Sequence, residues 1–291
     1  MPTEPGQVLI RRAAVLGSPI EHSLSPTLHR AAYAALGLDG WQYDRFEVDE
    51  AALGDFVSQL GPEWAGLSLT MPLKEQALLL AHTCDPVALK TGAVNTLVAE
   101  DDGWHGYNTD VYGVGAALVD AGVGTSVSPT SALVLGSGAT ARSVLAALAG
   151  LGVVRVTFAV RKDARASTLA QANDHGIEAR VVALADVDKV AHDFPLVIST
   201  LPHGAADAFA AEVLAGPPGR SPSGAIWMDV VYADWPTRFG VATEHAGARP
   251  VSGLEMLIHQ AVRQVELMTG RRPPLDVVQQ AGHAATATDG A

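Results

Sequence analysis

A glycine-rich turn carries the clearest chemistry in this sequence. Gly136 and Gly138 are followed by Ala141, a G-x-G-x-x-A turn between the apolar run 132–135 and a segment with helical periodicity. Glycines permit a tight turn and close backbone approach, and the start of the following helix offers free N–H groups to a pyrophosphate. The alternative is that these small residues only pack a helix on a sheet. We predict a dinucleotide site that comprises Gly136, Ser137, Gly138, Ala139 and Thr140.

Three cations follow the next predicted strand. An NAD-binding unit usually places Asp or Glu there, about 20 residues after the turn, to bind the ribose 2′-hydroxyl. This sequence instead has Arg161, Lys162 and Arg165. Positive charge at this place favours the 2′-phosphate of NADP. Two alternatives stay open: the cations form a solvated loop, or Asp163 makes the ribose contact.

A dinucleotide site implies redox chemistry, and several reductase classes lack their residues here. No tyrosine is followed by a lysine four positions later, and the sequence has neither a cysteine-rich ligand set nor an H-E-x-x-H motif for zinc. We therefore expect no catalytic metal. A group for proton transfer must be sought elsewhere, and one candidate is Lys74, a lone cation at the end of the apolar stretch GLSLTMPLK.

Five short motifs resemble those of the shikimate dehydrogenase family. They are S-x-S-P-x-x-H at residues 23–29, T-x-P-x-K-E at 70–75, G-A-x-N-T at 92–96, N-T-D at 108–110 and G-x-x-M-L with a later Gln at 253–260. Each is common alone, but all five occur in the family's order. The resemblance implies NADPH-dependent reduction of 3-dehydroshikimate to shikimate, in aromatic amino-acid and chorismate biosynthesis, with the substrate held between two domains.

The resemblance also implies roles for individual residues. Lys74 and Asp110 would be the catalytic pair, because hydride addition to a ketone puts negative charge on its oxygen and a nearby acid stabilises that charge. Hydroxyls and N–H groups at a helix start suit a carboxylate. The implied substrate ligands are Ser23 and Ser25 for the carboxylate, Thr70, Asn95 and Gln260 for the hydroxyls, and Tyr232. Thr200, Gly253 and Met256 would join the glycine turn and the cations as cofactor-binding residues.

Simpler interpretations of these residues stay open. Lys74 would be an exposed charge at a helix start, although the helix dipole disfavours a cation there. Asp110 and Ser25 would be helix N-caps, and Tyr232 would be a core tyrosine. The sequence also departs from the family's usual residues: an asparagine is replaced by Ser68, a third glycine by Ala139 or Thr140, N-R-T by residues 160–162 and N-A-T by residues 199–201.

Alternating strands and helices must position these motifs. Apolar runs at 13–17, 46–48, 67–70 and 94–98 predict strands, with helices at 25–37, 49–60 and 111–121. After the Gly/Ser/Thr-rich stretch 122–131, a strand, glycine turn, helix and strand begin a second unit, with further strands at 195–200 and 225–231. We predict an α/β fold: an N-terminal α/β substrate-binding domain of residues 1–110 and 252–291, and a Rossmann-type NADP-binding domain of residues 111–251 with its linker helix. A helix at 254–269 should return to the first domain, and residues 281–291 should form a frayed tail.

Composition limits the possible partners. The chain has 291 residues, of which 48% are apolar, enough for about two domains on the usual ~150-residue scale. A formal charge of −12 opposes binding to nucleic acid or an anionic membrane. The single cysteine, Cys84, excludes an internal disulfide and fits a reducing cytosol. No apolar run approaches the ~20 residues that span a bilayer. We expect a cytoplasmic monomer or homodimer whose partners are small molecules.

Two rival functions can be weighed from the sequence. The first is an NAD-dependent quinate or quinate/shikimate dehydrogenase, which Arg161 and Arg165 oppose because no acidic residue stands at Val160. The second is a catalytically silent, NADP-sensing regulatory protein on the same fold, which the retained Lys74 and Asp110 oppose. NADP-dependent shikimate dehydrogenase activity is the favoured function.

Overall fold

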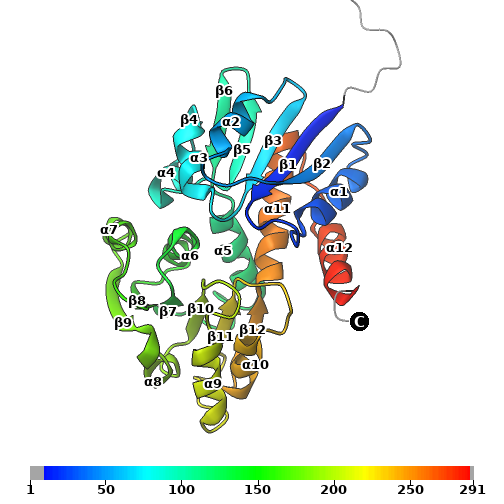
Figure 1. Cartoon of the computed structure of the whole chain (residues 1–291). Helices are drawn as coiled ribbons and strands as arrows, with labels where there is room; N and C mark the ends of the chain where they lie inside the picture. The colour runs from blue at the N-terminus through cyan, green and yellow to red at the C-terminus, as the bar shows by residue number, and fades with distance from the viewer. Residues whose placement is uncertain (1–9, 289–291) are drawn as a thin grey trace, which may run out of the picture. The chain divides into compact units, whose positions relative to one another are not determined.

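The computed structural model describes residues 10–288, which divide into two compact units (Figure 1). The first unit contains the described residues up to Thr109 together with Ala261–Ala285. The second consists mainly of Asp110–Gln260. The chain therefore crosses from one unit to the other at the start of one helix and again within a second helix.

The first unit is built on a mixed six-stranded sheet with the order β2-β1-β3-β5-β6-β4. Strand β1 pairs in parallel with β2 and β3, whereas β5 is antiparallel to both β3 and β6. Its strands are β1 (Arg11–Gly17), β2 (Trp41–Glu47), β3 (Trp64–Leu69), β4 (Thr83–Cys84), β5 (Thr96–Glu100) and β6 (Gly103–Tyr107). Its helices are α1 (Ser25–Ala35), α2 (Leu53–Ser58), α3 (Lys74–Leu80) and α4 (Pro86–Thr91), with α12 (Leu275–Thr288) following later in the chain.

Local sequence explains these elements well. All six residues of β3 are buried, which accounts for the apolar run that precedes Lys74. Helix α4 has a complete set of end signals: the side chain of Asp85 accepts the Ala88 N–H at 2.7 Å, Pro86 is the first helical residue, and Gly92 ends the helix at φ 60°. These contacts satisfy N–H groups at the start of the helix and place its end close to Asn95.

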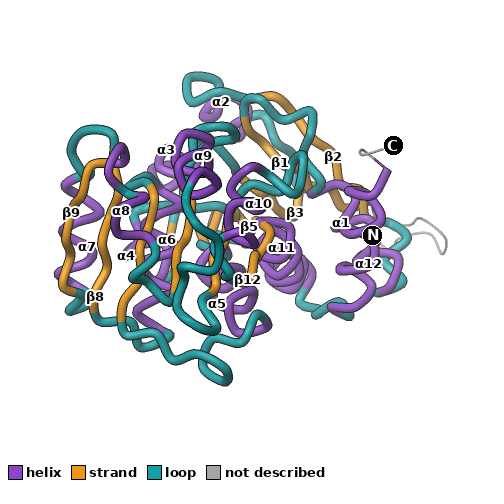
Figure 2. The backbone as a smooth tube through the Cα atoms, turned by 90° about the horizontal axis from the view of Figure 1, so that it is seen from below, coloured by secondary structure: helices purple, strands orange, loops and turns teal. Residues whose placement is uncertain are grey.

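The second unit is a six-stranded parallel sheet with the order β12-β11-β10-β7-β8-β9. Its strands are β7 (Ser131–Leu135), β8 (Arg155–Val160), β9 (Glu178–Ala183), β10 (Leu196–Ser199), β11 (Ile226–Asp229) and β12 (Arg249–Ser252). Its helices are α5 (Asp110–Asp120), α6 (Ala139–Gly150), α7 (Ala166–Asp174), α8 (Asp188–Ala191), α9 (Asp207–Ala215), α10 (Arg238–His245) and most of α11 (Gly253–Thr269), with a 3-10 turn at Leu184–Asp186. The strand order changes direction between β7 and β10, and doubly wound sheets bind ligands at the carboxyl ends of the strands beside such a point. Figure 2 shows β8 and β9 side by side at one edge of this sheet.

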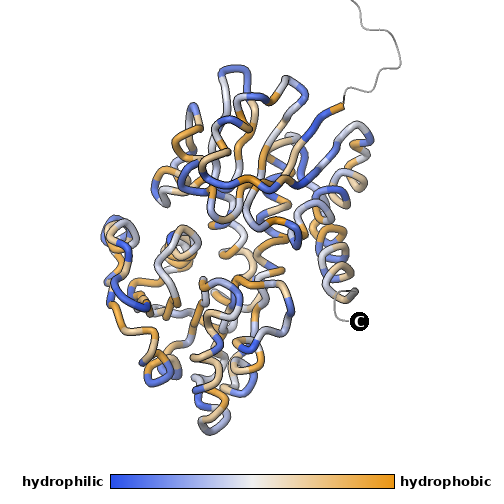
Figure 3. The backbone as a smooth tube through the Cα atoms, viewed as in Figure 1, coloured by the Kyte–Doolittle hydropathy of each residue, from blue (hydrophilic) through white to orange (hydrophobic). Residues whose placement is uncertain are grey.

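Helices cover both faces of the second sheet. Alternate strand residues point to opposite faces, so Val134 and Ile198 pack with residues of α5, α6 and α7, whereas Leu135 and Val197 pack with residues of α8, α9 and α10. The strands of this unit are accordingly drawn mostly in the apolar colours in Figure 3. The strands of a sheet that is buried on both faces have nearly continuous apolar sequences, which is the pattern found in this chain.

The predicted α/β class and the Rossmann-type second domain are confirmed, and the second half of α11 groups with the first unit as expected. Two local predictions were wrong. Residues 281–288 of the predicted frayed tail continue α12, and residues 289–291 lie outside the described residues. Helix α1 begins at Ser25, so the N-cap is Leu24 and not Ser25. No helix in the described part of the chain is both long and apolar enough to cross a bilayer.

Candidate active site

The turn after β3 is held against the end of β1. The Thr70 N–H donates to the Leu16 carbonyl at 2.9 Å, and the Ser18 N–H donates to the Met71 carbonyl at 3.0 Å. A Cβ atom on Gly17 would lie 2.4 Å from the Thr70 methyl group, so this approach requires glycine. Thr70, one of the predicted substrate ligands, is half-buried in this turn.

Lys74 begins α3, and its backbone is joined to the segment that contains Asn95. The Lys74 carbonyl accepts the Val94 N–H at 2.8 Å. Asn95 in turn donates its N–H to Tyr107 at 3.0 Å and accepts from the Leu69 N–H at 2.7 Å. Lys74 and Asn95 therefore lie where four elements meet: the start of α3, the start of β5, and the ends of β3 and β6. The Lys74 side chain is half-buried, not the fully exposed charge of the simpler interpretation.

Side-chain hydrogen bonds fix the amide group of Asn95. Its Oδ1 accepts the Thr109 N–H and the Thr96 hydroxyl, both at 2.8 Å, and its Nδ2 donates to the Thr109 hydroxyl at 2.9 Å. Asn95 is only 1% exposed. The next residue after Thr109 is Asp110, which begins α5 with its carboxyl group also buried. A buried carboxyl group is costly unless it has partners, which fits a functional residue better than an ordinary surface N-cap.

Ser23 and Ser25 lie together at the start of α1. The Ser25 N–H donates to the Ser23 hydroxyl oxygen at 3.3 Å. Ser25 is buried and Ser23 is half-buried. Because the residue at the N-cap position, Leu24, makes no side-chain capping bond, capping does not account for the serine hydroxyl at position 25.

In the second unit, the glycine turn closes on the loop after β10. Gly136 has φ +103°, and a Cβ atom on it would lie 2.6 Å from the Thr200 hydroxyl oxygen. That hydroxyl donates to the Leu135 carbonyl at 2.7 Å. Gly138 is the N-cap of α6, whose 12 residues follow directly. The predicted loop residues and Thr200 therefore gather at the carboxyl ends of β7 and β10, with a helix N-terminus facing the same edge.

The three predicted cations lie beside this turn. Arg161, Lys162 and Arg165 are exposed after β8. The Arg165 N–H donates to the Ser137 hydroxyl at 3.1 Å, and the Thr168 hydroxyl donates to the Ser137 carbonyl at 2.8 Å. Residue 137 of the glycine turn is thus tied to the loop that carries the cations. The guanidinium groups of Arg161 and Arg165 would then be available for charge-assisted hydrogen bonds to an anion bound at the glycine turn.

Close backbone contacts also position the start of α11. A Cβ atom on Gly253 would lie 2.1 Å from the Val230 carbonyl oxygen, so the loop after β11 fits only against glycine. A Cβ atom on Gly113 of α5 would lie 2.6 Å from the Met256 carbonyl oxygen. Gln260 is buried one turn later and donates its amide N–H to Leu257 at 3.1 Å. Three predicted residues of α11 thus lie in tightly packed surroundings.

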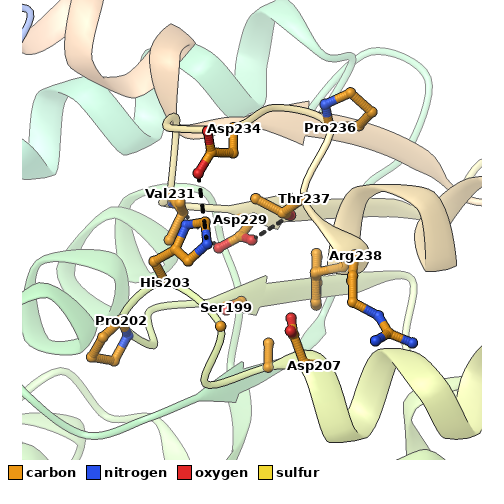
Figure 4. A pocket seen from close by; sticks show the side chains of 13 residues that line it. Ser199, Pro202, His203, Asp207, Asp229, Val231, Asp234, Pro236, Thr237 and Arg238 are labelled. Carbon is orange, nitrogen blue, oxygen red and sulfur yellow. Dashed lines mark hydrogen bonds and ion pairs between the residues drawn. The ribbon is translucent and has the colours of Figure 1, made fainter. Parts of the chain in front are cut away.

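A pocket of about 200 Å3 lies between the loops that follow β10 and β11 (Figure 4). Asp229 lines this pocket, and burial raises the pKa of its carboxyl group. The hydrogen bond that this carboxyl accepts from the Thr237 hydroxyl at 2.9 Å has the smaller, opposite effect on the pKa. Two other residues that line the pocket are His203 and Asp234, whose Nε2 and carboxylate oxygen lie 3.8 Å apart. Tyr232, in the loop after β11, is half-buried. The motifs did not select Asp229, although an acid that ends an apolar strand is a usable signal.

Sequence reasoning also missed two polar residues near predicted ones. Gln264 and Tyr43 are both buried in the first unit. Gln264 had a possible signal, because it is a polar residue one helical turn after Gln260 and next to the core residue Val265. No group of three or more His, Cys, Asp or Glu side chains among residues 10–288 is placed to hold a metal ion.

Family models match three parts of the chain. Residues 15–97 match the shikimate dehydrogenase substrate binding domain, residues 119–228 match shikimate / quinate 5-dehydrogenase, and residues 253–281 match the shikimate 5′-dehydrogenase C-terminal domain. A curated relative from Methanococcoides burtonii, named shikimate dehydrogenase (NADP(+)), is 35% identical over 268 residues. The similarity covers 92% of this chain and 95% of the relative.

Solved structures show the same fold. A shikimate dehydrogenase from Mycobacterium tuberculosis is 38% identical, with a TM-score of 0.81 over 94% of this chain and 99% of that one. A shikimate 5-dehydrogenase from Thermus thermophilus, solved in complex with NADP(H) and shikimate, is 31% identical, with a TM-score of 0.79 over 95% of this chain and 100% of that one. Both similarities cover nearly the full length of each chain.

Proposed function

Because the chain belongs to the shikimate dehydrogenase family, we propose that the residues described above carry out the family's reaction. The chain is an NADP-dependent oxidoreductase that interconverts 3-dehydroshikimate and shikimate in the shikimate pathway. The function predicted from the motifs is thereby confirmed, and neither rival is favoured. The observation that carries this conclusion is similarity over nearly the whole chain to relatives that share one named activity.

The two domains would divide the work. We propose that residues 1–110 and 252–291 bind the substrate and that residues 111–251 bind NADP. The two compact units support this division, since one contains the buried polar residues around Asn95 and the other contains the glycine turn. The proposed boundaries differ from those of the compact units mainly in α11, which contributes residues to both units.

The second unit has the features that NADP requires. Gly136 leaves space where any side chain would meet Thr200, and the N-terminus of α6 offers N–H groups to the pyrophosphate. Arg161, Lys162 and Arg165 would bind the 2′-phosphate through charge-assisted hydrogen bonds. Further cofactor contacts would come from Ser137, Gly138, Ala139, Thr140, Thr200, Gly253 and Met256. When bound, NADPH supplies the hydride.

The substrate would be held mainly through fixed polar groups. Ser23 and Ser25 would bind its carboxylate at the start of α1, where N–H groups add to the attraction. Thr70, Asn95 and Gln260 would bind the ring hydroxyls, and Tyr232 would contact the ring. Since Asn95 Oδ1 already accepts two hydrogen bonds within the protein, this residue would act on the substrate mainly as an N–H donor.

Lys74 would provide the proton. As the ketone is reduced, negative charge grows on its oxygen, and the ammonium group would stabilise this charge and donate a proton to the oxygen. Asp110 would hold the lysine in position and share its proton network. In the reverse direction the neutral lysine would accept the proton from the hydroxyl. Both roles require only these side chains and the substrate oxygen.

The direct test is an absorbance assay of the purified chain with shikimate and NADP, run beside NAD in place of NADP and quinate in place of shikimate. We expect the shikimate and NADP pair to give the highest kcat/KM. Faster turnover of quinate with NAD would favour the first rival. Tight NADP binding with no turnover of any pair would favour the regulatory protein.

We also propose that the enzyme works in the cytoplasm as a monomer or homodimer. A single cysteine fits a reducing compartment. Sedimentation velocity at several protein concentrations would measure the oligomeric state. A stable species larger than a dimer would contradict this proposal without affecting the proposed reaction.

A further inference from the structure

Ser68, which stands where the family usually has asparagine, is occupied by bonds within the protein. It is 3% exposed and lies near the end of the buried strand β3. Its hydroxyl oxygen accepts the Tyr43 hydroxyl at 2.6 Å, and its own hydroxyl donates to Gln264 Oε1 at 2.9 Å. A hydroxyl has one proton to donate, so Ser68 has none left for a substrate.

The amide group of Gln264 is fully engaged. Its Oε1 accepts from Ser68 at 2.9 Å and from His29 Nε2 at 3.2 Å, while its Nε2 donates to the Thr96 hydroxyl at 2.9 Å and to the Asn95 carbonyl at 3.2 Å. A carboxamide offers two acceptor and two donor positions, and all four are used. The orientation of this amide is therefore determined by its neighbours.

The proton on His29 follows from the same geometry. Because Gln264 Oε1 can only accept, His29 Nε2 must carry the hydrogen. Burial lowers the pKa of His29 to about 3, so the ring is neutral near pH 7. The ring also stacks on Tyr43 with centroids 3.9 Å apart and planes at 21°. The histidine thus acts as a neutral, fixed donor.

One end of this network reaches Asn95. The Thr96 hydroxyl receives the Gln264 N–H and donates its own proton to Asn95 Oδ1 at 2.8 Å. These bonds, together with the Thr109 N–H that also donates to Oδ1 at 2.8 Å, favour one orientation of the Asn95 amide. Turning the amide would place its N–H group against the Thr96 proton. Gln264 therefore supports, through Thr96, the same orientation of the Asn95 amide that the Thr109 N–H favours.

The other end reaches the start of α1. The Tyr43 hydroxyl donates to Ser68, and the neighbouring side chain of Ser25 lowers the Tyr43 pKa against the larger effect of burial, which raises it. Ser25 is a proposed ligand of the substrate carboxylate, and Asn95 is a proposed ligand of a ring hydroxyl. Asn95 is thus joined to Gln264 through buried hydrogen bonds, and Ser25 lies beside Tyr43 at the other end of the same network.

We propose that Gln264 is a positioning residue for the substrate, and that Ser68 and Tyr43 transmit its effect to Ser25 while Thr96 transmits it to Asn95. Ser68 then belongs to this support and is not a direct ligand of shikimate. The inference rests on the proposed function, since it assigns the two supported residues to substrate binding. It also accounts for the departure at position 68, because serine is short enough to leave space for the glutamine amide.

The central experiment replaces Gln264 with methionine, which has nearly the same shape but neither donates nor accepts these bonds. We expect the Kd for shikimate, measured by titration calorimetry well below the melting temperature, to rise about tenfold or more, the loss expected from buried hydrogen bonds. The KM for NADP should stay within about twofold. Ser68→Ala should weaken shikimate binding several-fold, and the double variant should lose less than the product of the two single losses.

A matched control is Gln171→Met in the second unit. Gln171 is also buried, and its amide donates to the Arg142 carbonyl at 3.0 Å. This variant should lower the melting temperature without changing the Kd for shikimate. It separates the loss of any buried glutamine from the loss of this particular one.

Two results from the single variants would overturn the inference. One is a Gln264→Met protein that melts at a lower temperature but binds shikimate as tightly as the wild type. The other, decisive if Gln264→Met does not fold, is a Ser68→Ala protein with unchanged affinity for shikimate. Losses that simply multiply in the double variant would instead make Ser68 an independent ligand, which also contradicts the proposal. A wild-type chain that does not oxidise shikimate would refute the proposed function itself.

Discussion

The proposed substrate residues and the proposed cofactor residues are held in place by different means. Around Asn95, the amide and hydroxyl groups of several buried side chains are hydrogen-bonded to one another. Around Gly136, the backbone is shaped by glycine, and the charged groups at Arg161 and Arg165 are exposed. The first arrangement fixes geometry, and the second supplies charge.

This difference has an energetic consequence. Removing one member of a buried network leaves its partners without hydrogen bonds, which costs about 1–3 kcal/mol for each group. An exposed charge loses little when its partner is removed, because water and salt already screen it. Substitutions among the buried substrate residues should therefore have large effects on substrate binding and turnover. Substitutions of a few exposed cations should alter only the preference between NADP and NAD.

The largest effect should come from Lys74. If its ammonium group stabilises the developing alkoxide, Lys74→Ala should lower kcat by about 10²- to 10⁴-fold. The KM for shikimate should change much less, because the interaction forms mainly in the transition state. Steady-state kinetics at saturating NADP measure both. A variant with near-normal kcat would return Lys74 to a charge that merely begins a helix.

Asp110 provides a second measurement on the same step. Asp110→Asn should also lower kcat, and the Lys74→Ala, Asp110→Asn double variant should lose less than the product of the single losses. Losses that multiply would mean that the two side chains act independently.

Ser25 should show the next largest effect. Ser25→Ala removes a hydrogen bond to an anion, worth roughly 1.5–3 kcal/mol, so shikimate affinity should fall by about ten- to a hundredfold. NADP affinity should not change. Ser23→Ala is the matched comparison at the less buried hydroxyl, and it should cost less. If Ser25→Ala loses only thermal stability, the hydroxyl serves the fold and not the substrate.

The buried histidine predicts a pH effect on stability. His29 has a pKa of about 3 in the folded protein and about 6.5 when unfolded. Between these values only the unfolded state binds the proton, so stability falls as pH falls, by about 1.4 kcal/mol per pH unit. Urea unfolding at pH 7 and pH 5 should show the wild type losing about 2 kcal/mol more than His29→Gln. Equal losses would mean that this histidine is protonated in the fold.

Arg161 should show the smallest effect. Exposed ion pairs contribute about 0.2–1 kcal/mol, so Arg161→Ala should raise the KM for NADP by no more than about fivefold and leave the KM for NAD nearly unchanged. Kinetics with both cofactors at fixed ionic strength measure the difference. An equal rise for both cofactors would show that the arginine shapes the loop instead of binding the 2′-phosphate.

Much of the architecture could be predicted from short-range patterns. Apolar runs marked β3, β7 and β10, and the glycine turn placed α6, because strand burial and helix starts depend on neighbouring residues. Strands β4, β6, β9 and β12 were not predicted, because most of their residues are exposed or half-buried and they lack a continuous apolar run. The N-cap prediction at Ser25 failed by a single residue at a helix boundary, the least certain point of any such prediction.

The support of the site could not be predicted in this way. Gln264 and Ser68 are 196 positions apart in the sequence, and Gln264 and Asn95 are 169 apart. Nothing in either neighbourhood indicates the other, because a buried polar group finds its partner only when distant strands and helices pack together. The motifs found residues proposed to touch substrate, whereas the residues beneath them required the structure.

Helix α11 limits how this protein can change its length over evolution. Gln260 lies in the second compact unit and Gln264, one turn later, lies in the first. One residue inserted or deleted between them would rotate the rest of the helix by about 100°. Such a change would move Gln264 away from Ser68 while every side chain in the motifs stayed the same. Homologues should therefore tolerate gaps in surface loops such as residues 122–130, and keep the spacing between these two glutamine positions constant.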